Sequence, residues 1–239
     1  MVALDPDLLL RAYSVGVFPM ASTRDASDVF WVEPKKRGIL PLDGFHLSRS
    51  LAKTIRSDRF IVTVDQAFSD VVSHCAEATA RRPDTWINPE IETAYAELHR
   101  RGYAHSVETW HNGELAGGLY GVRLGAAFFG ESMFSRARDA SKVALAHLVA
   151  RLKVGEFKLL DCQFLTEHLA SLGTIEVGRD AYVALLDRAL GLGSAAAGEA
   201  SGPADFFALD RLGTPDEEAA TVSGPISGWR IVQLLGHTS

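Results

Sequence analysis

Residues 104–135 of the chain read AHSVETWHNGELAGGLYGVRLGAAFFGESMFS, and this stretch decides the fold class. It contains three segments of strand-like, largely apolar character, at 104–110, 113–122 and 126–135. Asn112-Gly113 separates the first two segments and Gly125 the last two, and an Asn-Gly pair favours a two-residue hairpin turn. The stretch therefore predicts a meander of three antiparallel strands.

The segments on either side of this meander have the periodicity of helices and of two further strands. We predict strands at 59–64 and 157–164, and helices at 48–56, 86–102, 140–152, 165–173 and 179–190, with one more that follows Asp65 and contains Phe68 and Cys75. Ser48, Asp65, Asn88 and Asp139 stand where a helix N-cap is expected. This order predicts an α+β or α/β arrangement built on a mixed sheet.

The two ends of the chain differ from this central region, so we divide the chain in three. Residues 1–43 are rich in Pro and Gly and poorly periodic, which predicts a small N-terminal domain. Residues 44–190 hold the predicted sheet and its helices. Residues 191–239 include the low-complexity segment GSAAAGEASGPADFF and predict a mobile tail, although WRIVQLL near its end is apolar enough to dock on the rest.

Composition excludes several classes of protein. The chain has 239 residues, 47% of them hydrophobic, but no apolar run approaches the length of a membrane span. Asp5 and Asp7 stand where a signal peptide would carry positive charge, so we expect a cytoplasmic protein without membrane contact. Cys75 and Cys162 are spaced for neither a disulfide framework nor a zinc motif, and we expect no metal and no cofactor.

Cations cluster in the first quarter of the chain. The net charge is −6, but Lys35, Lys36 and Arg37 are consecutive, and Arg49 and Lys53 follow at helical spacing. A local patch, rather than the net charge, decides whether nucleic acid can bind. Charge alone leaves two interpretations open, a solvated face and a nucleic-acid contact.

Three polar residues interrupt the apolar strands, namely Glu131 in GESMFS and Asp161 and Gln163 in LLDCQF. Because alternate side chains of a strand share a face, Asp161 and Gln163 are expected on one face and Cys162 on the other. Glu131 is expected to share the face of Met133. If both faces line one cleft, it is apolar with few convergent polar groups, which is typical of small-molecule sites. The alternative is structural: Asp161 and Gln163 bond the backbone at a strand end, and Glu131 pairs with an arginine.

Other chemistries are less well supported. GESMFS lacks the second glycine of a GxSxG nucleophile elbow, and GGLYG does not have the spacing of a nucleotide-binding GxGxxG loop. Cys162 as a nucleophile would need a nearby base and an electropositive setting, and an inward core thiol is the expected alternative.

Longer stretches of the sequence, taken together, resemble a known family. VGVFPM, FWVEPKKRGILPLDGFHLSRSL, TWINPEIETAYAELHRRGYAHSVETW, ELAGGLYGV, GESMFSR, DASKVAL and LLDCQFLTEHLASLG occur in this order between about residues 8 and 190. They closely resemble leucyl/phenylalanyl-tRNA–protein transferases. The resemblance implies transfer of Leu or Phe, and less well Met, from Leu-tRNA or Phe-tRNA to the N-terminal amine of proteins that begin with Arg or Lys. It also implies a small N-terminal domain followed by an acetyltransferase-like (GNAT-like) mixed-sheet domain, and a monomer.

The resemblance also implies roles for particular residues. Asp161 and Gln163 occupy the DCQ motif, where we assign Asp161 to polarising the acceptor amine and Gln163 to bridging the amine and the ester carbonyl, and Glu131 is expected at the aminoacyl pocket. Met133, Leu119, Phe128 and Ser132 are expected to line that pocket, Trp31 and Trp86 to lie near the terminal adenosine, and Lys35, Lys36, Arg37, Arg49 and Lys53 to contact the tRNA. Strict alternation places Phe128 opposite Glu131, so its presence in the pocket would require a bulge. The family's GGMYG reads GGLYG here, which places Leu119 where the family has Met.

Several alternatives remain open at the level of the sequence. The ribose hydroxyl of the terminal adenosine, rather than a protein group, could accept the proton during transfer. Rival functions are a tRNA-dependent transferase of peptidoglycan bridges, and a non-catalytic adaptor that binds tRNA or basic protein N-termini.

Overall fold

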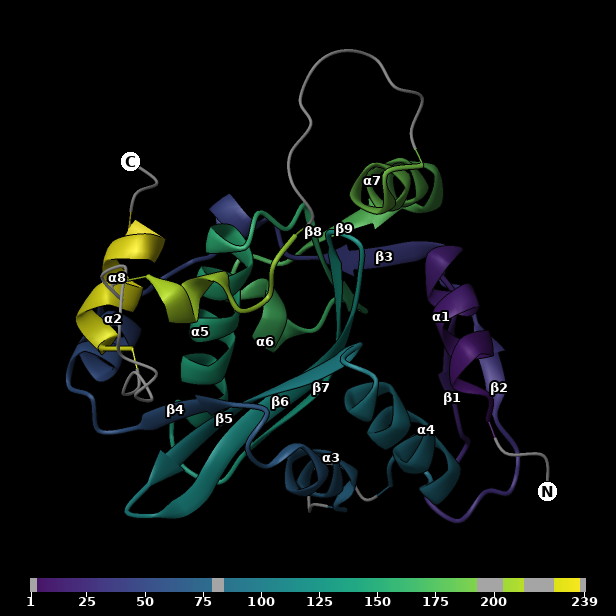
Figure 1. Cartoon of the computed structure of the whole chain (residues 1–239), viewed down its shortest axis with the longest axis horizontal. Helices are drawn as coiled ribbons and strands as arrows, with labels where there is room; N and C mark the ends of the chain where they lie inside the picture. Colours follow the sequence, from purple (N-terminus) through teal and green to yellow (C-terminus); the bar gives the residue numbers. More distant parts are fainter. Residues whose placement is uncertain (1–3, 79–83, 193–203, 213–225, 237–239) are drawn as a thin grey trace.

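Helices cover both faces of a seven-stranded mixed sheet (Figure 1). The computed structural model describes residues 4–78, 84–192, 204–212 and 226–236. The elements are, in chain order, α1 (Pro6–Ser14), β1 (Phe18–Met20), β2 (Phe30–Val32), β3 (Lys36–Ile39), η1 (Leu42–Gly44), α2 (Arg49–Arg56), β4 (Ile61–Val64), α3 (Phe68–Ala76), α4 (Pro89–Arg100), β5 (Ala104–His111), β6 (Glu114–Leu124), β7 (Ala127–Ser135), α5 (Ala140–Val154), β8 (Leu159–Gln163), α6 (Glu167–Ala170), β9 (Ile175–Gly178), α7 (Arg179–Leu190), η2 (Ala208–Arg211) and α8 (Gly228–Gly236).

The predicted meander forms the centre of the large sheet. Its strand order is β4-β5-β6-β7-β8-β3-β9, with β5, β6 and β7 joined as antiparallel hairpins. The pairing of β7 with β8 is parallel, which the α5 crossover between them makes possible. The α+β class and the mixed sheet predicted from the sequence are confirmed.

Strand β3 changes the predicted boundary of the N-terminal domain. It lies within the segment 1–43 that the sequence marks as irregular, yet it is hydrogen-bonded between β8 and β9 in the large sheet. The small N-terminal unit therefore consists of α1 and the separate β1–β2 hairpin, and it ends before Lys36. The sequence missed β3 because four residues with two cations and a glycine have no strand periodicity.

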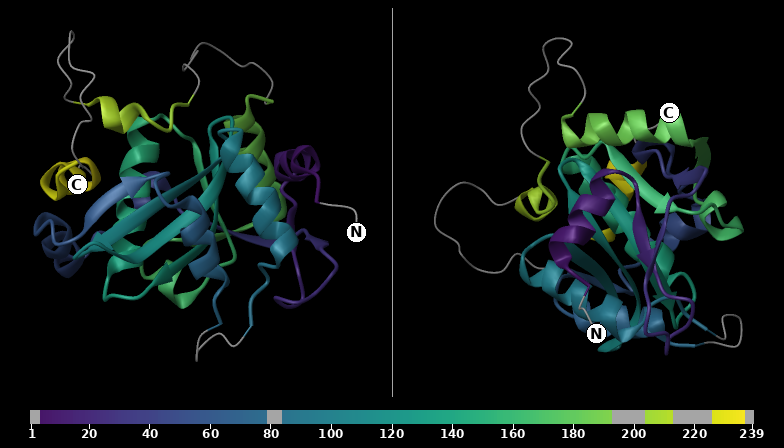
Figure 2. Two further views of the ribbon diagram at one scale, coloured as in Figure 1. Left: turned by 60° about the horizontal axis from the view of Figure 1, so that its bottom comes forward. Right: turned by 90° about the vertical axis from the view of Figure 1, so that its right-hand side faces the viewer.

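The sheet separates two hydrophobic cores. One core lies under α2, α5, η2 and α8, and the other lies under α1, α3, α4 and α7. Helix α5 is apolar on nearly all sides, with residues buried from Ala140 to Leu152. A helix of this kind must be covered on every face, and the sheet covers one side of α5 while α2, η2 and α8 cover others (Figure 2, left).

The C-terminal region is therefore not a free tail throughout. Phe206 is fully buried and its ring stacks on those of His105 and Phe128, while Arg151 of α5 forms an ion pair with Asp210 at 2.5 Å. Ile231 of α8 is also fully buried. Most of the low-complexity segment predicted to be mobile lies outside the described residues, but its end and WRIVQLL belong to the core.

Two predicted helix caps make no capping hydrogen bond: Asp139 stands at the N-cap of α5 without one, and Asp65 does not occupy the N-cap of α3. Asp65 precedes α3 but does not cap it, because the helix begins after Ala67 and has no side-chain cap. The carboxylate of Asp65 instead accepts hydrogen bonds from the backbone N–H of Ser106 at 2.8 Å and from the ring of His105 at 2.7 Å. Asp65 thus joins the start of the α3 segment to β5.

We predict that the C-terminal segment stabilises the fold through Phe206. Phe206→Ala should lower the free energy of unfolding by about 3–5 kcal/mol, because it removes a buried ring from a packed core. The neighbouring Phe207 is 41% exposed, so Phe207→Ala is a matched control that should cost much less. Urea unfolding of both variants measures this, and equal losses would contradict the packing described here.

Candidate active site

A cavity of ≈ 270 Å³ lies where β7 and β8 separate. The two strands pair in parallel only where Ala127–Phe129 lie beside Leu159–Asp161. Beyond these residues each strand continues without the other. The walls of the cavity are mostly apolar and include Leu119, Met133, Leu145, Leu148, Leu160 and Leu169. Glu131 and Gln163 bring polar groups to it, so the cavity has the character of a small-molecule site.

Glu131 is the extra residue of a β-bulge. Gly121 pairs with Gly130 and Tyr120 with Ser132, so Glu131 has no partner on β6. A bulge redirects side chains and reverses the alternation of the strand beyond it. As a result Glu131 points toward α1 and α4, where it meets hydroxyl groups, and the apolar residues that follow it return to the cavity wall.

Three hydrogen bonds hold the Glu131 carboxyl group. Its Oε1 accepts from the Tyr13 hydroxyl at 2.7 Å and from Nε2 of Gln163 at 2.8 Å, and its Oε2 accepts from the Tyr95 hydroxyl at 3.1 Å. The two tyrosine hydroxyls also contact each other. In the sequence, the spacing of the predicted helix at 86–102 marks Tyr95 as an inward residue. Tyr13 has no such mark, because it lies in a segment predicted to be irregular.

The pKa of Glu131 lies near neutrality. Burial raises it from 4.5 to about 7, and the three hydrogen bonds partly oppose this rise because they favour the carboxylate. The alternative that Glu131 pairs with an arginine is wrong, since its partners are neutral donors. Glu131 can therefore gain or lose a proton in the physiological pH range.

Asp161 does not face the cavity. It is fully buried on the other side of β8, where Arg37 donates three hydrogen bonds to it from Nε and Nη2, at 2.7–3.0 Å. The Tyr182 hydroxyl donates a further bond at 2.7 Å, and the backbone N–H of Gln163 another at 2.8 Å. With all its acceptor sites occupied, Asp161 has none left for a substrate amine, so the predicted direct contact is wrong.

Gln163 reaches the cavity because the chain turns at that residue. Its φ of 61° is in the left-handed region, and the backbone N–H of Phe164 donates to the carbonyl of Cys162 at 2.7 Å. Gly38 permits this turn, since a Cβ on Gly38 would lie 2.8 Å from the backbone carbon of Phe164. The alternation expected for LLDCQF therefore stops at Gln163, and Cys162 rather than Asp161 lies on the cavity wall.

Cys162 is not a suitable nucleophile. Burial, with the charge of Asp161 as a second cause, raises the pKa of its thiol to about 12. The thiol is therefore protonated at neutral pH, and only the thiolate is strongly nucleophilic.

The other predicted pocket residues divide into two groups. Leu119, Ser132, Met133 and Trp86 lie on the cavity wall. Phe128 does not, because it is fully buried in the core against Phe206 even though the required bulge is present. Trp31 lies on β2, is 40% exposed and is not part of the wall.

The predicted basic patch is not one surface. Arg37 is 1% exposed and paired with Asp161, so it cannot contact a nucleic acid. Lys36 is at the start of β3 and pairs with Glu176 of β9, whereas Arg49 and Lys53 lie on α2 at the opposite side of the molecule (Figure 1). These cations are close in the sequence but do not form one surface, because β3 and α2 lie in different parts of the fold.

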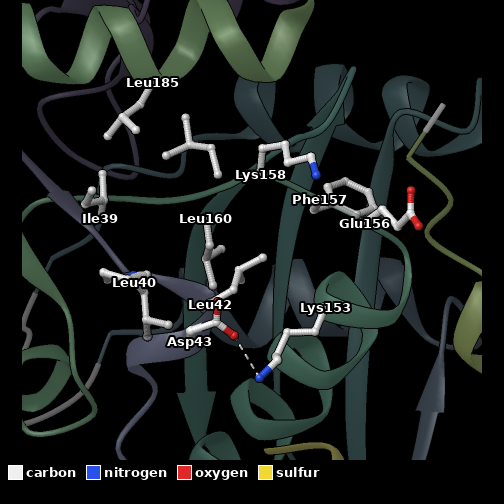
Figure 3. A pocket seen from close by; sticks show the side chains of 12 residues that line it. Ile39, Leu40, Leu42, Asp43, Lys153, Glu156, Phe157, Lys158, Leu160 and Leu185 are labelled. Atoms are coloured by element: carbon white, nitrogen blue, oxygen red, sulfur yellow. Dashed lines mark ion pairs between the residues drawn. The ribbon is translucent and has the colours of Figure 1, made fainter. Parts of the chain in front are cut away.

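A second, larger cavity of ≈ 620 Å³ also has Leu160 in its wall (Figure 3). Leu40, Leu42 and Leu185 form part of its wall, and Lys153 at its edge is paired with Asp43 at 3.0 Å. It contains neither Glu131 nor Gln163. Leu160 is the residue that contributes to both walls.

Two kinds of feature are absent from the described residues. Among the described residues there is no cluster of three or more His, Cys, Asp or Glu side chains that could hold a metal ion. Within the same residues, every helix is too short or too polar to cross a lipid bilayer.

Comparison with known proteins shows the same family over both parts of the chain. A sequence model described as leucyl/phenylalanyl-tRNA protein transferase matches residues 39–187, and the model of that family's N-terminal domain matches residues 3–35. The chain is 70% identical to the leucyl/phenylalanyl-tRNA–protein transferase of Rhizorhabdus wittichii over 100% of both chains. It is 55% identical to that of Afipia carboxidovorans, over 99% of this chain and 95% of the relative. It is also 65% identical to that of Zymomonas mobilis, over 78% and 70% of the two chains.

We predict that the Arg37–Asp161 pair is strongly coupled. Arg37→Met should lower the free energy of unfolding by about 3–5 kcal/mol, because it leaves a buried carboxylate without its cation. The double variant Arg37→Met/Asp161→Leu, which leaves neither charge, should lose less than the sum of the two single variants. Lys36→Met, which breaks the exposed pair next to it, is the control and should have little effect. Additive losses in urea unfolding would refute the coupling.

Glu131 should make stability depend on pH. Its pKa is higher in the folded state than in the unfolded chain, so the folded state retains a proton that the unfolded chain releases. The contribution of Glu131 to stability is therefore fully present below about pH 4.5 and falls by about 3 kcal/mol as the pH rises through about 7. Glu131→Gln should remove this component, whereas Glu114→Gln, at an exposed glutamate, should not. If the free energies of unfolding of Glu131→Gln and of the parent change in the same way between pH 4.5 and 7.5, Glu131 does not titrate as described.

Proposed function

Because the chain belongs to the leucyl/phenylalanyl-tRNA–protein transferase family, we propose that the cavity between β7 and β8 holds the amino acid carried by Leu-tRNA or Phe-tRNA. The protein transfers this amino acid to the N-terminal α-amine of proteins that begin with Arg or Lys. The new N-terminus marks the acceptor for degradation by the N-end rule.

The observation that carries this proposal is the composition of the cavity. Its apolar wall accepts the side chain of Leu or Phe, and the pair Glu131–Gln163 provides polar groups for the reacting atoms. Met133 is unbranched and adaptable, which suits a wall that accepts both amino acids. Leu119 stands where the family has Met, and its stiffer side chain is expected to affect the preference between Leu and Phe.

The reaction itself requires little activation. The amine nitrogen attacks the ester carbonyl carbon, a C–N bond forms, the C–O bond to the ribose breaks, and the ribose oxygen leaves with a proton. The donor is already an ester, and an α-amine with a pKa of about 7.7–8.0 is partly neutral at pH 7. Proximity and one proton acceptor are sufficient, so neither ATP nor a cofactor is needed.

We assign separate roles in the reaction to the carboxyl group of Glu131 and the amide group of Gln163. Glu131 holds Nε2 of Gln163, which leaves the amide oxygen of Gln163 to accept a hydrogen bond from the attacking amine. Glu131 has a pKa near 7 and lines the cavity, so it is the proton acceptor that we propose. Asp161 acts through Gln163, whose backbone it holds, and is a positioning residue.

We also propose for this chain the fold type, adenosine contacts, oligomeric state and compartment that the family implies. The divergence of β7 and β8 after three parallel pairs supports an acetyltransferase-like (GNAT-like) fold for the large sheet. Trp86 on the cavity wall supports stacking on the terminal adenosine, a role that we also keep for the more distant Trp31. A single chain contains the whole cavity, which supports a monomer, and we propose that it acts in the cytoplasm.

Contact with the tRNA is proposed mainly for α2. Arg49 and Lys53 are exposed and form no ion pair within the described part of the chain. Lys35 and Lys36 are also exposed but lie away from α2, so they would contact a different part of the tRNA or none.

We predict that Gln163→Ala lowers transfer about 100-fold. The assay mixes the protein with labelled Phe-tRNA and a peptide that begins with Arg, without ATP, and measures label in the peptide. The loss is expected in kcat, since a positioned polar group acts on the transition state. Gln66→Ala, at an exposed glutamine, is the control. Transfer by Gln163→Ala within threefold of the parent would exclude the role assigned to Gln163, and no transfer by the parent would exclude the function.

A further inference from the structure

The C-terminal helix α8 is joined to α2. The backbone N–H of Gly228 donates to Oδ1 of Asp58 at 2.7 Å, just beyond the end of α2. A Cβ at position 228 would lie 1.9 Å from the carbonyl oxygen of Ile55, so only glycine permits this approach. Ile231 is fully buried beneath the contact. The two helices therefore lie side by side at the edge of the molecule (Figure 2, left).

All charged residues on these two helices are cations. The sequences RSLAKTIR and GWRIVQLLG contain no acidic residue, although the whole chain has a net charge of −6. Arg49, Lys53, Arg56 and Arg230 are not within ion-pair distance of any acid in the described ranges of the chain. Asp58, which joins the two helices, adds one carboxylate against these four cations, so the face that these helices share remains electropositive and can attract an anionic partner.

Helix stability does not explain this pattern. Lys53 and Arg56 are in the last turn of α2, where a cation is favoured by the helix dipole. Arg230 is in the first turn of α8, where the same dipole disfavours a cation. The carboxylate of Asp58 also lies at this end of α8, bonded to the N–H of Gly228, and it offsets part of this cost.

An exposed aromatic ring lies among these cations. Trp229 is 59% exposed, and the guanidinium of Arg56 lies over its ring, 5.2 Å from the ring centroid. Proteins that bind single-stranded nucleic acids use this combination, since the aromatic ring stacks on bases and the cations contact phosphates. The same residue types also suit an anionic membrane surface, but the neighbouring cavity, which we propose holds the aminoacyl end of a tRNA, favours a nucleic acid here.

The face also lies next to the candidate active site. Residues Thr166, His168 and Leu169 around α6 line the cavity. Two residues after α6, the carbonyl of Leu172 accepts a hydrogen bond from the N–H of His46 at 2.9 Å, and α2 begins three residues later. A chain of nucleotides that leaves the cavity past α6 therefore meets α2 and then α8.

We propose that α8, through Trp229 and Arg230 together with Arg56 of α2, binds the acceptor arm of the tRNA whose aminoacyl end occupies the cavity. This inference rests on the proposed function, and it assigns a role to the C-terminal segment beyond the contacts of Arg49 and Lys53. Arg56 and Arg230 contact phosphates, and the Trp229 ring stacks on an unpaired base or a ribose near the 3′ end of this arm.

Direct binding of Phe-tRNA tests this surface. The variant Arg56→Glu/Arg230→Glu should weaken binding at least about tenfold and reduce the slope of log K against log[salt] by about 2. Arg11→Glu/Arg188→Glu, on α1 and α7, makes the same change of net charge at exposed positions elsewhere and should have a much smaller effect. Trp229→Ala should weaken binding about tenfold, and Trp229→Phe should retain most of it.

A minimal donor separates binding from chemistry. Transfer from phenylalanyl-adenosine, which lacks the acceptor arm, to an Arg-ended peptide should be unchanged in all these variants. If the α2–α8 charge variant binds Phe-tRNA as tightly as the control variant, or if transfer from the minimal donor falls in parallel, the proposal is overturned. Absence of transfer by the parent would refute the proposed function, while the binding comparison would still decide this inference.

Discussion

The buried ion pair between Arg37 and Asp161 is the interaction on which the rest of the structure depends. Two buried charges are tolerated only when each is fully paired and hydrogen-bonded. Arg37 meets this demand by also donating to the carbonyl of Gly16 at 2.8 Å and by lying between the rings of Phe18 and Tyr182. The pair thus holds together the N-terminal unit, β3, β8 and α7, which are far apart in the sequence.

The geometry of the candidate active site follows from this pair. Asp161 accepts a bond from the backbone of Gln163, which is in the left-handed region at the end of β8. This directs the side chain of Gln163 to Glu131, which the bulge in β7 has brought to the same place. Two local departures from regular strand geometry are therefore matched to each other, and strain of this kind is typical of functional sites.

The C-terminal segments complete the fold on the face of the sheet that α5 covers. Helix α5 supplies Leu145 and Leu148 to the cavity and is covered from outside by η2 and α8. Removal of that cover would expose a helix that is apolar on nearly every side. The same segments place Trp229 beside Arg56, so an element that stabilises the core also shapes a surface next to the site.

The sequence by itself determined the fold class, the β5–β7 meander and the family, because these depend on local periodicity, turn residues and long motifs. It also indicated Glu131 and Gln163 as candidate site residues, and both line the cavity. Only the tertiary structure decided which face each polar side chain takes, since the bulge at Glu131 and the turn at Gln163 overrule strand alternation. It likewise moved Arg37 from the predicted surface to a buried pair with Asp161, because that contact joins residues 124 positions apart and no local pattern records it.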